Sequence, residues 1–164
     1  MILTEADPAH FVEILALNEA SVHVLSPLSA ERLAHLHSHA AYHKVVLEEG
    51  RVAAFLLAFA SGAPYDSLNY QWFESRMTSF IYIDRVVVSS DSRGRGLASR
   101  LYQDLFDHAR VCGVGQVVCE FDVEPPNLAS ERFHLHFGFS EVGRQRVGGG
   151  SKEVSLQAVS LVVS

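Results

Sequence analysis

The alternation of apolar and polar residues predicts a chain of short helices and strands. Apolar residues recur at helical spacing in the N-terminal part, and runs rich in β-branched and aromatic residues, broken by Gly or Pro, read as strands. In chain order the predicted elements are a helix beginning near Asp7-Pro8, a helix from about Ser29 to Ala40, strands over 44–47, 52–60 and 80–88, a helix over 97–111, a strand over 116–123, a helix over 128–137, and strands over 140–147 and 153–162. The aromatic-rich stretch 65–76 shows no clear period, so no element is predicted there.

The order of these elements predicts the fold class. A strand, a helix and a second strand follow one another between 80 and 123, which implies a parallel pair of strands. Hairpins with turns at Glu49-Gly50 and at 148–151 add antiparallel strands on either side. The pattern therefore predicts an α/β (α+β) protein with a mixed sheet.

Composition and charge narrow the classes of function. The chain has 164 residues, 48% of them apolar, which fits a single domain over 1–164. No apolar run approaches the roughly 20 residues of a membrane span, and the N-terminus lacks the basic region of a signal peptide. A net charge of −6 argues against a nucleic acid or an anionic membrane as partner. Cys112 and Cys119 are expected to be buried, reduced thiols, which predicts a cytoplasmic protein.

The segment from Val88 to Ser99 is the strongest candidate binding site. A strand ends, a short polar loop follows, and Arg93-Gly94-Arg95-Gly96 opens a helix. The first turn of a helix has N–H groups without partners and partial positive charge, which suits a phosphate. The glycines permit close approach of the backbone, and the arginines add positive charge. The alternatives are a plain strand-to-helix turn or a dinucleotide-binding loop, although the full G-x-G-x-x-G pattern is absent.

Two motifs in this part of the chain resemble those of the GNAT superfamily of N-acetyltransferases. The family pattern Q/R-x-x-G-x-G/A is matched by Arg93, Gly96 and Ala98. Downstream, Asn127-x-x-Ser130-x-x-Phe133-His134-x-x-x-Gly138-Phe139 is similar to the family's Asn-x-x-Ala/Ser-x-x-Phe-Tyr-x-x-x-Gly-Phe. The two motifs stand in the family's order, one helix and one strand apart.

The resemblance implies a fold, a co-substrate and a set of contacts. The GNAT fold has a mixed, mostly antiparallel central sheet of six to seven strands, a splayed parallel central pair, and helices on both faces. The co-substrate would be acetyl-CoA, with its diphosphate on the loop amides and its pantetheine arm along the strand before the loop. The implied cofactor-binding residues are Val86, Val87, Val88, Arg93, Gly94, Arg95, Gly96, Leu97, Ala98, Ser99, Asn127, Ser130, Phe133 and His134.

The resemblance also suggests how a proton could be moved during transfer. His134 occupies the position where many members have a tyrosine thought to protonate the departing thiolate, so His134 is a candidate general acid. The alternative is a histidine that only contacts the cofactor. Glu120 and Asp84 are candidate bases for the amine, from the two parallel strands. A salt bridge to Arg85 is the alternative for Asp84, and a paired or solvated strand face is the alternative for Glu120.

The acceptor is expected to contact the aromatic stretch. Tyr65, Asn69 and Tyr70 are the predicted substrate-binding residues, whereas Trp72 and Phe73 are expected to belong to the core. The histidines between 35 and 43 are read as a surface cluster, and no metal site is predicted.

The resemblance thus implies an enzyme that transfers an acetyl group from acetyl-CoA to a primary amine on a small molecule or peptide, by direct attack of the amine in a ternary complex. The net acidity favours a cationic acceptor. The alternative is a non-catalytic acyl-CoA sensor of the same fold. A homodimer is an open alternative for assembly, because members of the family often form dimers.

Overall fold

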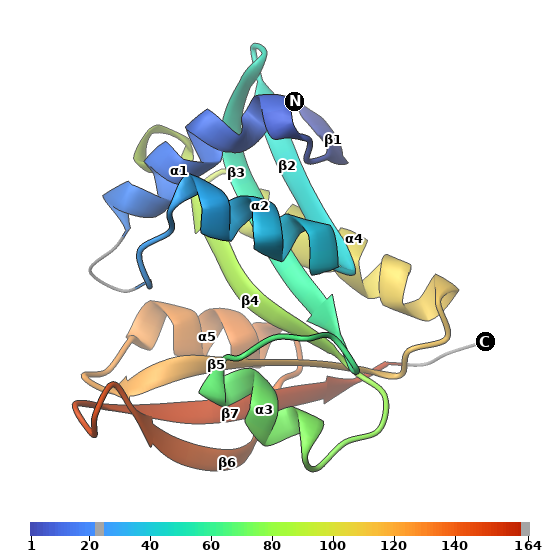
Figure 1. Cartoon of the computed structure of the whole chain (residues 1–164), viewed down its shortest axis with the longest axis vertical. Helices are drawn as coiled ribbons and strands as arrows, with labels where there is room; N and C mark the ends of the chain where they lie inside the picture. Colours follow the sequence, from blue (N-terminus) through green and yellow to red (C-terminus); the bar gives the residue numbers. More distant parts are fainter. Residues whose placement is uncertain (22–24, 162–164) are drawn as a thin grey trace. The chain divides into compact units, whose positions relative to one another are not determined.

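The computed structural model describes residues 1–21 and 25–161, and the chain folds into strands and helices that are labelled in Figure 1. The strands are β1 (Ile2–Glu5), β2 (Tyr42–Glu48), β3 (Arg51–Ala60), β4 (Ile81–Val88), β5 (Gln116–Glu124), β6 (Ser140–Val147) and β7 (Lys152–Ser160). The α-helices are α1 (Phe11–Ala20), α2 (Ala30–His39), α3 (Leu68–Glu74), α4 (Leu97–Val111) and α5 (Leu128–His136). Short 3-10 turns, η1 (Pro8–His10) and η2 (Ser90–Ser92), precede α1 and α4.

The strands pair in the order β1-β2-β3-β4-β5-β7-β6. The parallel pairing joins Ile81 with Val117 and Tyr82 with Val118, and the registers of β1–β2, β2–β3, β5–β7 and β6–β7 are antiparallel. This mixed sheet with one parallel pair confirms the predicted fold class. Within the described residues no helix is long and apolar enough to cross a membrane.

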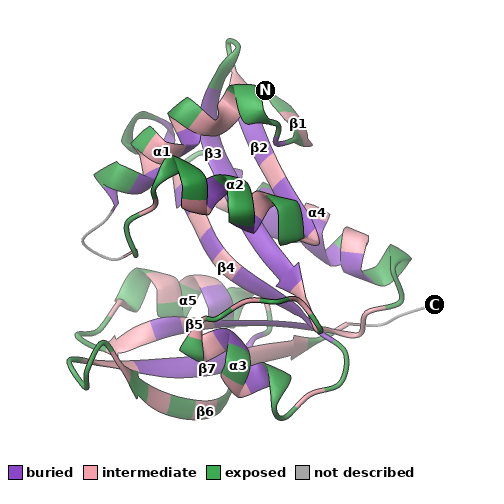
Figure 2. Cartoon of the chain, viewed as in Figure 1, coloured by how far each residue is buried: buried purple, intermediate pink, exposed green. Residues whose placement is uncertain are grey.

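The chain divides into two compact units. The first consists of Met1–Phe59 and Ile83–His108. Alternate residues of β2 face opposite sides of the sheet. Val45 lies in a core with Ile14 and Leu33 from α1 and α2, whereas Tyr42 and Lys44 face the other side. There the Tyr42 hydroxyl and the Lys44 ammonium both donate to Asp104 Oδ2 of α4, at 2.7 and 2.8 Å. Two helices therefore cover one face of these strands and α4 covers the other, and buried residues are concentrated along β2 and β3 (Figure 2).

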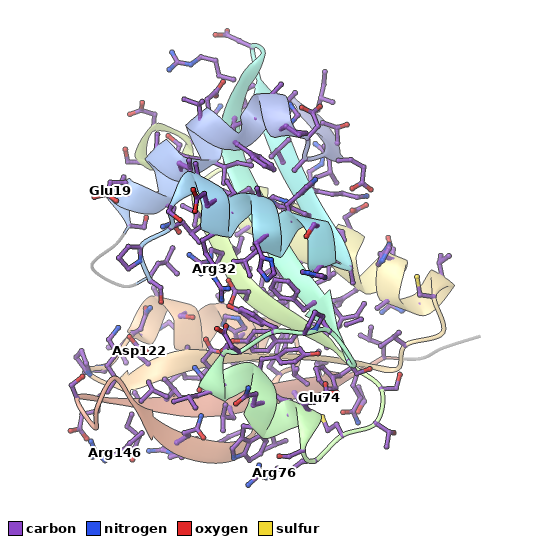
Figure 3. All side chains as sticks on the ribbon, in the orientation of Figure 1. Glu19, Arg32, Glu74, Arg76, Asp122 and Arg146 are labelled. Carbon is purple, nitrogen blue, oxygen red and sulfur yellow. The ribbon has the colours of Figure 1, made fainter. Side chains whose placement is uncertain are left out.

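The second unit consists of Ala60–Tyr82 and Ala109–Ser164, described to residue 161. Its helices lie against opposite faces of β5. Tyr70 of α3 contacts Tyr82, which bonds to Glu120, whereas the neighbouring Phe121 contacts His134 of α5. On β6, a Cβ at Gly143 would lie 2.8 Å from Trp72 Cη2, so only glycine leaves room for that indole. The guanidinium of Arg76 lies 4.1 Å from the centre of the Trp72 ring (Figure 3).

Most predicted elements are confirmed, and two were missed: β1 and α3. Val162, the predicted end of the last strand, lies outside the described residues. The expectation that both thiols are buried is wrong for Cys112, which is exposed just after α4, and right for Cys119. The prediction that the histidines between 35 and 43 lie at the surface is wrong for His43, which is 4% exposed in β2. It fits His35 and His39, which are exposed on α2 with ring centres 4.8 Å apart.

Candidate active site

The loop between β4 and α4 is held by its ends and open in its middle. Before the loop, Val87 packs in the core, and after it Leu97 is buried at the start of α4. Between them Gly94 and Gly96 have φ angles of 79° and 76°, a region that side-chain-bearing residues rarely adopt. A Cβ at either glycine would meet nothing within 4 Å, so backbone conformation, not lack of room, demands glycine at both positions.

The amides of this loop have the pattern of an anion site. Among the residues that the structure describes, none accepts a hydrogen bond from the N–H groups of 93 to 99. Seven consecutive free donors at the start of a 15-residue helix, whose first turn contains no acidic residue, favour a bound anion. These are the residues to which the sequence assigned a diphosphate, and their geometry fits such a group.

The two arginines of the loop differ in their surroundings. Arg93 is exposed and makes no hydrogen bond or ion pair with the described residues. Arg95 instead donates to Glu48 Oε1 at 2.6 Å and to Ser92 Oγ at 3.0 Å. Arg95 and Glu48 also line a cavity of about 460 Å³ that is bounded by α1, the β2–β3 turn and the loop.

Asp84 and Arg85, adjacent on β4, form a buried ion pair. Arg85 Nε donates to Asp84 Oδ2 at 2.6 Å, and both side chains are 6% exposed. The same guanidinium donates to Asn18 Oδ1 of α1 at 2.8 Å and to the Ser26 carbonyl at 3.1 Å. The salt bridge considered as the alternative for Asp84 is therefore present.

His134 lies on α5, which begins at the other predicted motif. Asn127 caps this helix by accepting from the Ser130 N–H at 3.2 Å, so its side chain serves the helix itself. His134 is 5% exposed among Phe121, Phe133 and Phe139. Burial lowers the pKa of His134, and the hydrogen bond to the Ser130 carbonyl raises it by less, so the imidazole is neutral at pH 7.

The hydrogen bond to Ser130 fixes the position of the His134 proton. His134 Nδ1 lies 2.7 Å from the Ser130 carbonyl oxygen and 3.2 Å from the Ser130 Oγ. Because a carbonyl oxygen only accepts, Nδ1 must carry the proton. The basic nitrogen of the neutral ring is therefore Nε2.

Glu120 belongs to a cluster of tyrosines in the second unit. The Tyr82 hydroxyl, which was not among the predicted site residues, donates to Glu120 Oε1 at 2.6 Å. The rings of Tyr65 and Tyr70 lie 6.4 and 5.6 Å from that of Tyr82. The structure thus places two of the predicted substrate-binding residues beside Tyr82, the tyrosine that donates to one candidate base.

Asn69 and the Tyr70 hydroxyl have other partners. Asn69 Oδ1 accepts from Gln145 Nε2 of β6 at 2.9 Å. The Tyr70 hydroxyl donates to the Ala60 carbonyl at 2.6 Å and accepts from the Ala63 N–H at 3.0 Å. Burial raises the Tyr70 pKa to about 12, so this hydroxyl stays protonated as a structural group. Within the described residues no three His, Cys, Asp or Glu side chains are placed to hold a metal ion.

Comparison with known proteins identifies the family. Residues 10–139, which include the loop and the whole motif from Asn127 to Phe139, match the model of the acetyltransferase (GNAT) family. The chain belongs to this family. Because the match spans both motifs, the GNAT resemblance drawn from them is confirmed.

One curated relative and many solved structures are similar to this GNAT chain. Over 101 residues it is 31% identical to phosphinothricin N-acetyltransferase of Streptomyces coelicolor, covering 57% of this chain and 50% of that protein. The chain therefore spans about half the length of the curated relative that it matches.

Three solved structures show the same fold at low sequence identity. The ribosomal-protein-S18-alanine N-acetyltransferase of Escherichia coli has a TM-score of 0.75 and 15% identity, covering 99% of this chain and 95% of that one. An N-acetyltransferase of Staphylococcus aureus Mu50 has a TM-score of 0.73 and 24% sequence identity, with 98% of both chains covered. The structure of yncA from Salmonella typhimurium with its cofactor acetyl-CoA has a TM-score of 0.75 and 20% sequence identity, covering 100% of this chain and 95% of that one.

Proposed function

We propose that this chain transfers an acetyl group from acetyl-CoA to a primary amine. The observation that carries the proposal is the run of free N–H groups from 93 to 99 at the start of α4. Family membership supports acetyl-CoA as the anion bound there, and the relative yncA was solved with that cofactor. Arg93, exposed and unpaired among the described residues, supplies the mobile positive charge for the diphosphate.

The reaction requires one bond to form and one to break. The amine nitrogen bonds to the thioester carbonyl carbon, the carbon–sulfur bond breaks, and the sulfur leaves with CoA as a thiolate. The proton that the amine gives up to a base is balanced by the proton that this thiolate takes up to become the free thiol of CoA. In the chain, we assign that base to Glu120, which accepts from the hydroxyl of Tyr82, whose ring lies beside those of Tyr65 and Tyr70. The Asp84 carboxylate is instead bound by Arg85, which favours Glu120 over Asp84.

His134 is better suited to accept a proton than to donate one. Its neutral ring holds the proton on Nδ1 against the Ser130 carbonyl, so Nε2 is the nitrogen that can bind a further proton. Donation from Nε2 requires the imidazolium form, which burial disfavours because the pKa is lowered. We therefore assign His134 to proton acceptance or relay, in place of the general-acid role suggested by the family tyrosine.

The acceptor we propose is a primary amine on a small molecule or a peptide. The aromatic rings and the Glu120 carboxylate together suit a cationic amine, which loses its proton before attack. Phosphinothricin, named in the curated relative, belongs in the first panel of candidates, beside amino acids, polyamines and peptides.

Release of free thiol from acetyl-CoA across this panel tests the proposal. We expect thiol release that depends on one class of amine, and calorimetric binding of CoA. Binding of CoA with no turnover on any amine would favour the sensor alternative. A preference for an adenine dinucleotide over CoA would contradict the assignment of the loop.

The loop itself is tested by Gly96→Glu. The carboxylate would stand where the diphosphate binds, and the positive φ would add strain of about 1–2 kcal/mol. We expect CoA binding to be lost. The matched control is Gly149→Glu in the β6–β7 turn, where φ is 67° and a Cβ would likewise meet nothing within 4 Å. Unchanged CoA affinity in Gly96→Glu would refute the placement of the diphosphate.

A further inference from the structure

Three side chains join the end of β2 to the loop that follows β4. Glu48 Oε1 accepts from the Ser92 hydroxyl at 2.7 Å and from Arg95 Nη2 at 2.6 Å. Arg95 Nη2 also donates to Ser92 Oγ at 3.0 Å, which closes a triangle of hydrogen bonds. Ser92 is 6% exposed and the Glu48 side chain 20%, whereas the Arg95 side chain is 51% exposed, so the triangle is shielded from water on the side of Ser92 and Glu48.

The triangle acts on the most deformable part of the loop. Arg95 stands between Gly94 and Gly96, both with positive φ. Glycine is the residue with the most backbone freedom, so a loop with two of them around one residue loses much entropy when its amides must point to one place. A side chain fixed at the middle residue removes that freedom before any ligand arrives.

The hydrogen-bonded triangle of Glu48, Ser92 and Arg95 acts as a tether, and its Glu48 end belongs to a regular strand. Glu48 is the last residue of β2 and pairs with Arg51 across the hairpin. Glu49 and Gly50 form a tight turn with φ angles of 51° and 78°, as in hairpin turns of type I′. The carboxylate is therefore held by a strand end, not by a mobile loop.

The direction of the Arg95 side chain agrees with a tether. Arg95 lines the cavity of about 460 Å³ together with Glu48, Ser92 and Asp91, whereas Arg93, Gly94, Gly96 and Leu97 do not line it. The guanidinium is thus engaged with a carboxylate on the cavity side of the loop. Family motifs include Arg95 only as a variable position, and none of them includes Glu48.

We infer that Glu48 is a positioning residue, which through Ser92 and Arg95 preorganises the loop amides to receive the diphosphate of acetyl-CoA. The inference rests on the proposed function for the identity of the ligand, but the tether itself exists without a ligand. It assigns Arg93 and the backbone, not Arg95, to direct contact with the diphosphate. Glu48 accordingly affects binding of the co-substrate and not the chemical step.

Glu48→Gln tests this, with Glu49→Gln as the matched control. Both remove one negative charge from neighbouring positions, but Glu49 is exposed and makes no interaction with the described residues. We expect Glu48→Gln to raise the KM for acetyl-CoA about fivefold with kcat unchanged, since partly exposed ion pairs contribute modestly. S-acetylpantetheine, which lacks the diphosphate, should be used equally well by both variants and the parent chain.

The competing assignment, in which Arg95 itself binds the diphosphate, gives the opposite result. Glu48→Gln would then release Arg95 and leave the affinity for acetyl-CoA unchanged or increased, which would overturn the inference. A tether further requires that Arg95→Gln and the double variant Glu48→Gln/Arg95→Gln weaken binding no more than Glu48→Gln alone. If the fold-losses of acetyl-CoA affinity in the two single variants multiply in the double variant, the two side chains act independently and the tether is contradicted. If Glu48→Gln does not fold, Ser92→Ala is judged by the same comparison.

A measurement without ligand separates this inference from the proposed function. Backbone ¹⁵N order parameters of Gly94 and Gly96 should fall from about 0.85 to below about 0.6 in Glu48→Gln, and should not change in Glu49→Gln. Unchanged order parameters would remove the tether even if acetyl-CoA binds. A parent chain that binds no CoA would end the proposed function, while a fall in the order parameters would still establish the tether.

Discussion

At the scale of single residues, the proton on His134 distinguishes two mechanisms. The neutral ring donates from Nδ1 to the Ser130 carbonyl at 2.7 Å, so only Nε2 can take up a further proton. Burial lowers the pKa of this imidazole from its ordinary 6.5, even though the bond to Ser130 acts in the other direction. A proton acceptor loses activity when it is already protonated, whereas a proton donor loses activity when it is not.

We therefore expect kcat to fall as the pH drops below the lowered pKa of His134. We also expect His134→Phe to reduce kcat by about 100-fold or more, the usual contribution of proton transfer, with little change in the KM for acetyl-CoA. The ring fits a pocket already formed by Phe121, Phe133 and Phe139. His136→Phe, on the exposed side of the same helix, is the control for fold and solubility. A rate that rises as the pH falls would instead identify His134 as a general acid.

What the sequence revealed about the site depended on how local each feature is. The glycines at positive φ and the start of α4 are encoded within a few neighbouring residues, and they could be predicted. The partners of these residues could not. Glu48 and Ser92 are 44 positions apart, and Tyr82 and Glu120 are 38 apart, so only the folded sheet brings them together. No sequence signal marks a hydroxyl donor or a carboxylate acceptor at such separations.

At the scale of elements, the same reasoning explains the two that were missed. The strand β1 has only four residues and pairs with β2 alone at the edge of the sheet, so it has little period to detect. The helix α3 has seven residues, several of them aromatic, which are moderate helix formers. Its available signal was Ser67, which caps the helix by accepting from the Tyr70 N–H, followed by Tyr70 and Phe73 at helical spacing.

The attachment of α4 to β2 depends on one carboxylate that receives two donors. Asp104 Oδ2 accepts from the Tyr42 hydroxyl and from Lys44. Burial alone would raise the pKa of Asp104, but these hydrogen bonds and the Lys44 charge lower it overall, so it is ionised at neutral pH. Because Tyr42 is 3% exposed, loss of its partner leaves a buried hydroxyl unsatisfied.

Asp104→Ala should lower the free energy of unfolding by about 1–3 kcal/mol, the cost of a buried polar group without a partner. Urea denaturation measures the loss, and Tyr42→Phe provides the second arm of a double-mutant cycle. We expect the double variant to be less destabilised than the sum of the two single variants, because each removes part of the same interaction. Strictly additive losses would show that the hydroxyl and the carboxylate stabilise the fold independently.

At the scale of the whole molecule, a buried histidine links stability to pH. His43 of β2 is 4% exposed, contacts Phe55 and Phe11, and shares an Nδ1–Nδ1 hydrogen bond of 2.8 Å with His37. Within the described residues its Nε2 has no hydrogen-bond partner. Burial, and then repulsion from His37 and His10, lowers the pKa of His43 to about 4.

The sign of the effect follows from which state binds the proton. Above pH 6.5 the imidazole is neutral in both states. Between about 6.5 and about 4 the unfolded chain takes up a proton that the folded chain does not, so the free energy of unfolding falls as the pH falls. The total loss assigned to this one group is roughly 3 kcal/mol, at up to about 1.4 kcal/mol per pH unit. Below pH 4 its contribution levels off.

We expect His43→Phe to reduce the fall in the free energy of unfolding between pH 6.5 and 4 by up to about 1.4 kcal/mol per pH unit. Urea denaturation at several pH values between 7 and 4 measures this change. Phenylalanine keeps the packing against Phe11 and Phe55 and cannot be protonated, while His37, only half-buried, can exchange its lost partner for water. His39→Phe, exposed on α2, should keep the acid limb of the parent chain. His134 also has a lowered pKa, so a residual slope in His43→Phe is expected and should decrease when His134→Phe is added, leaving the slope near pH 4 to which the lowered pKa values of the Asp104 and Glu141 carboxyls contribute. A slope that is the same with and without His43 would show that carboxylates, and not this histidine, set the response of the molecule to acid.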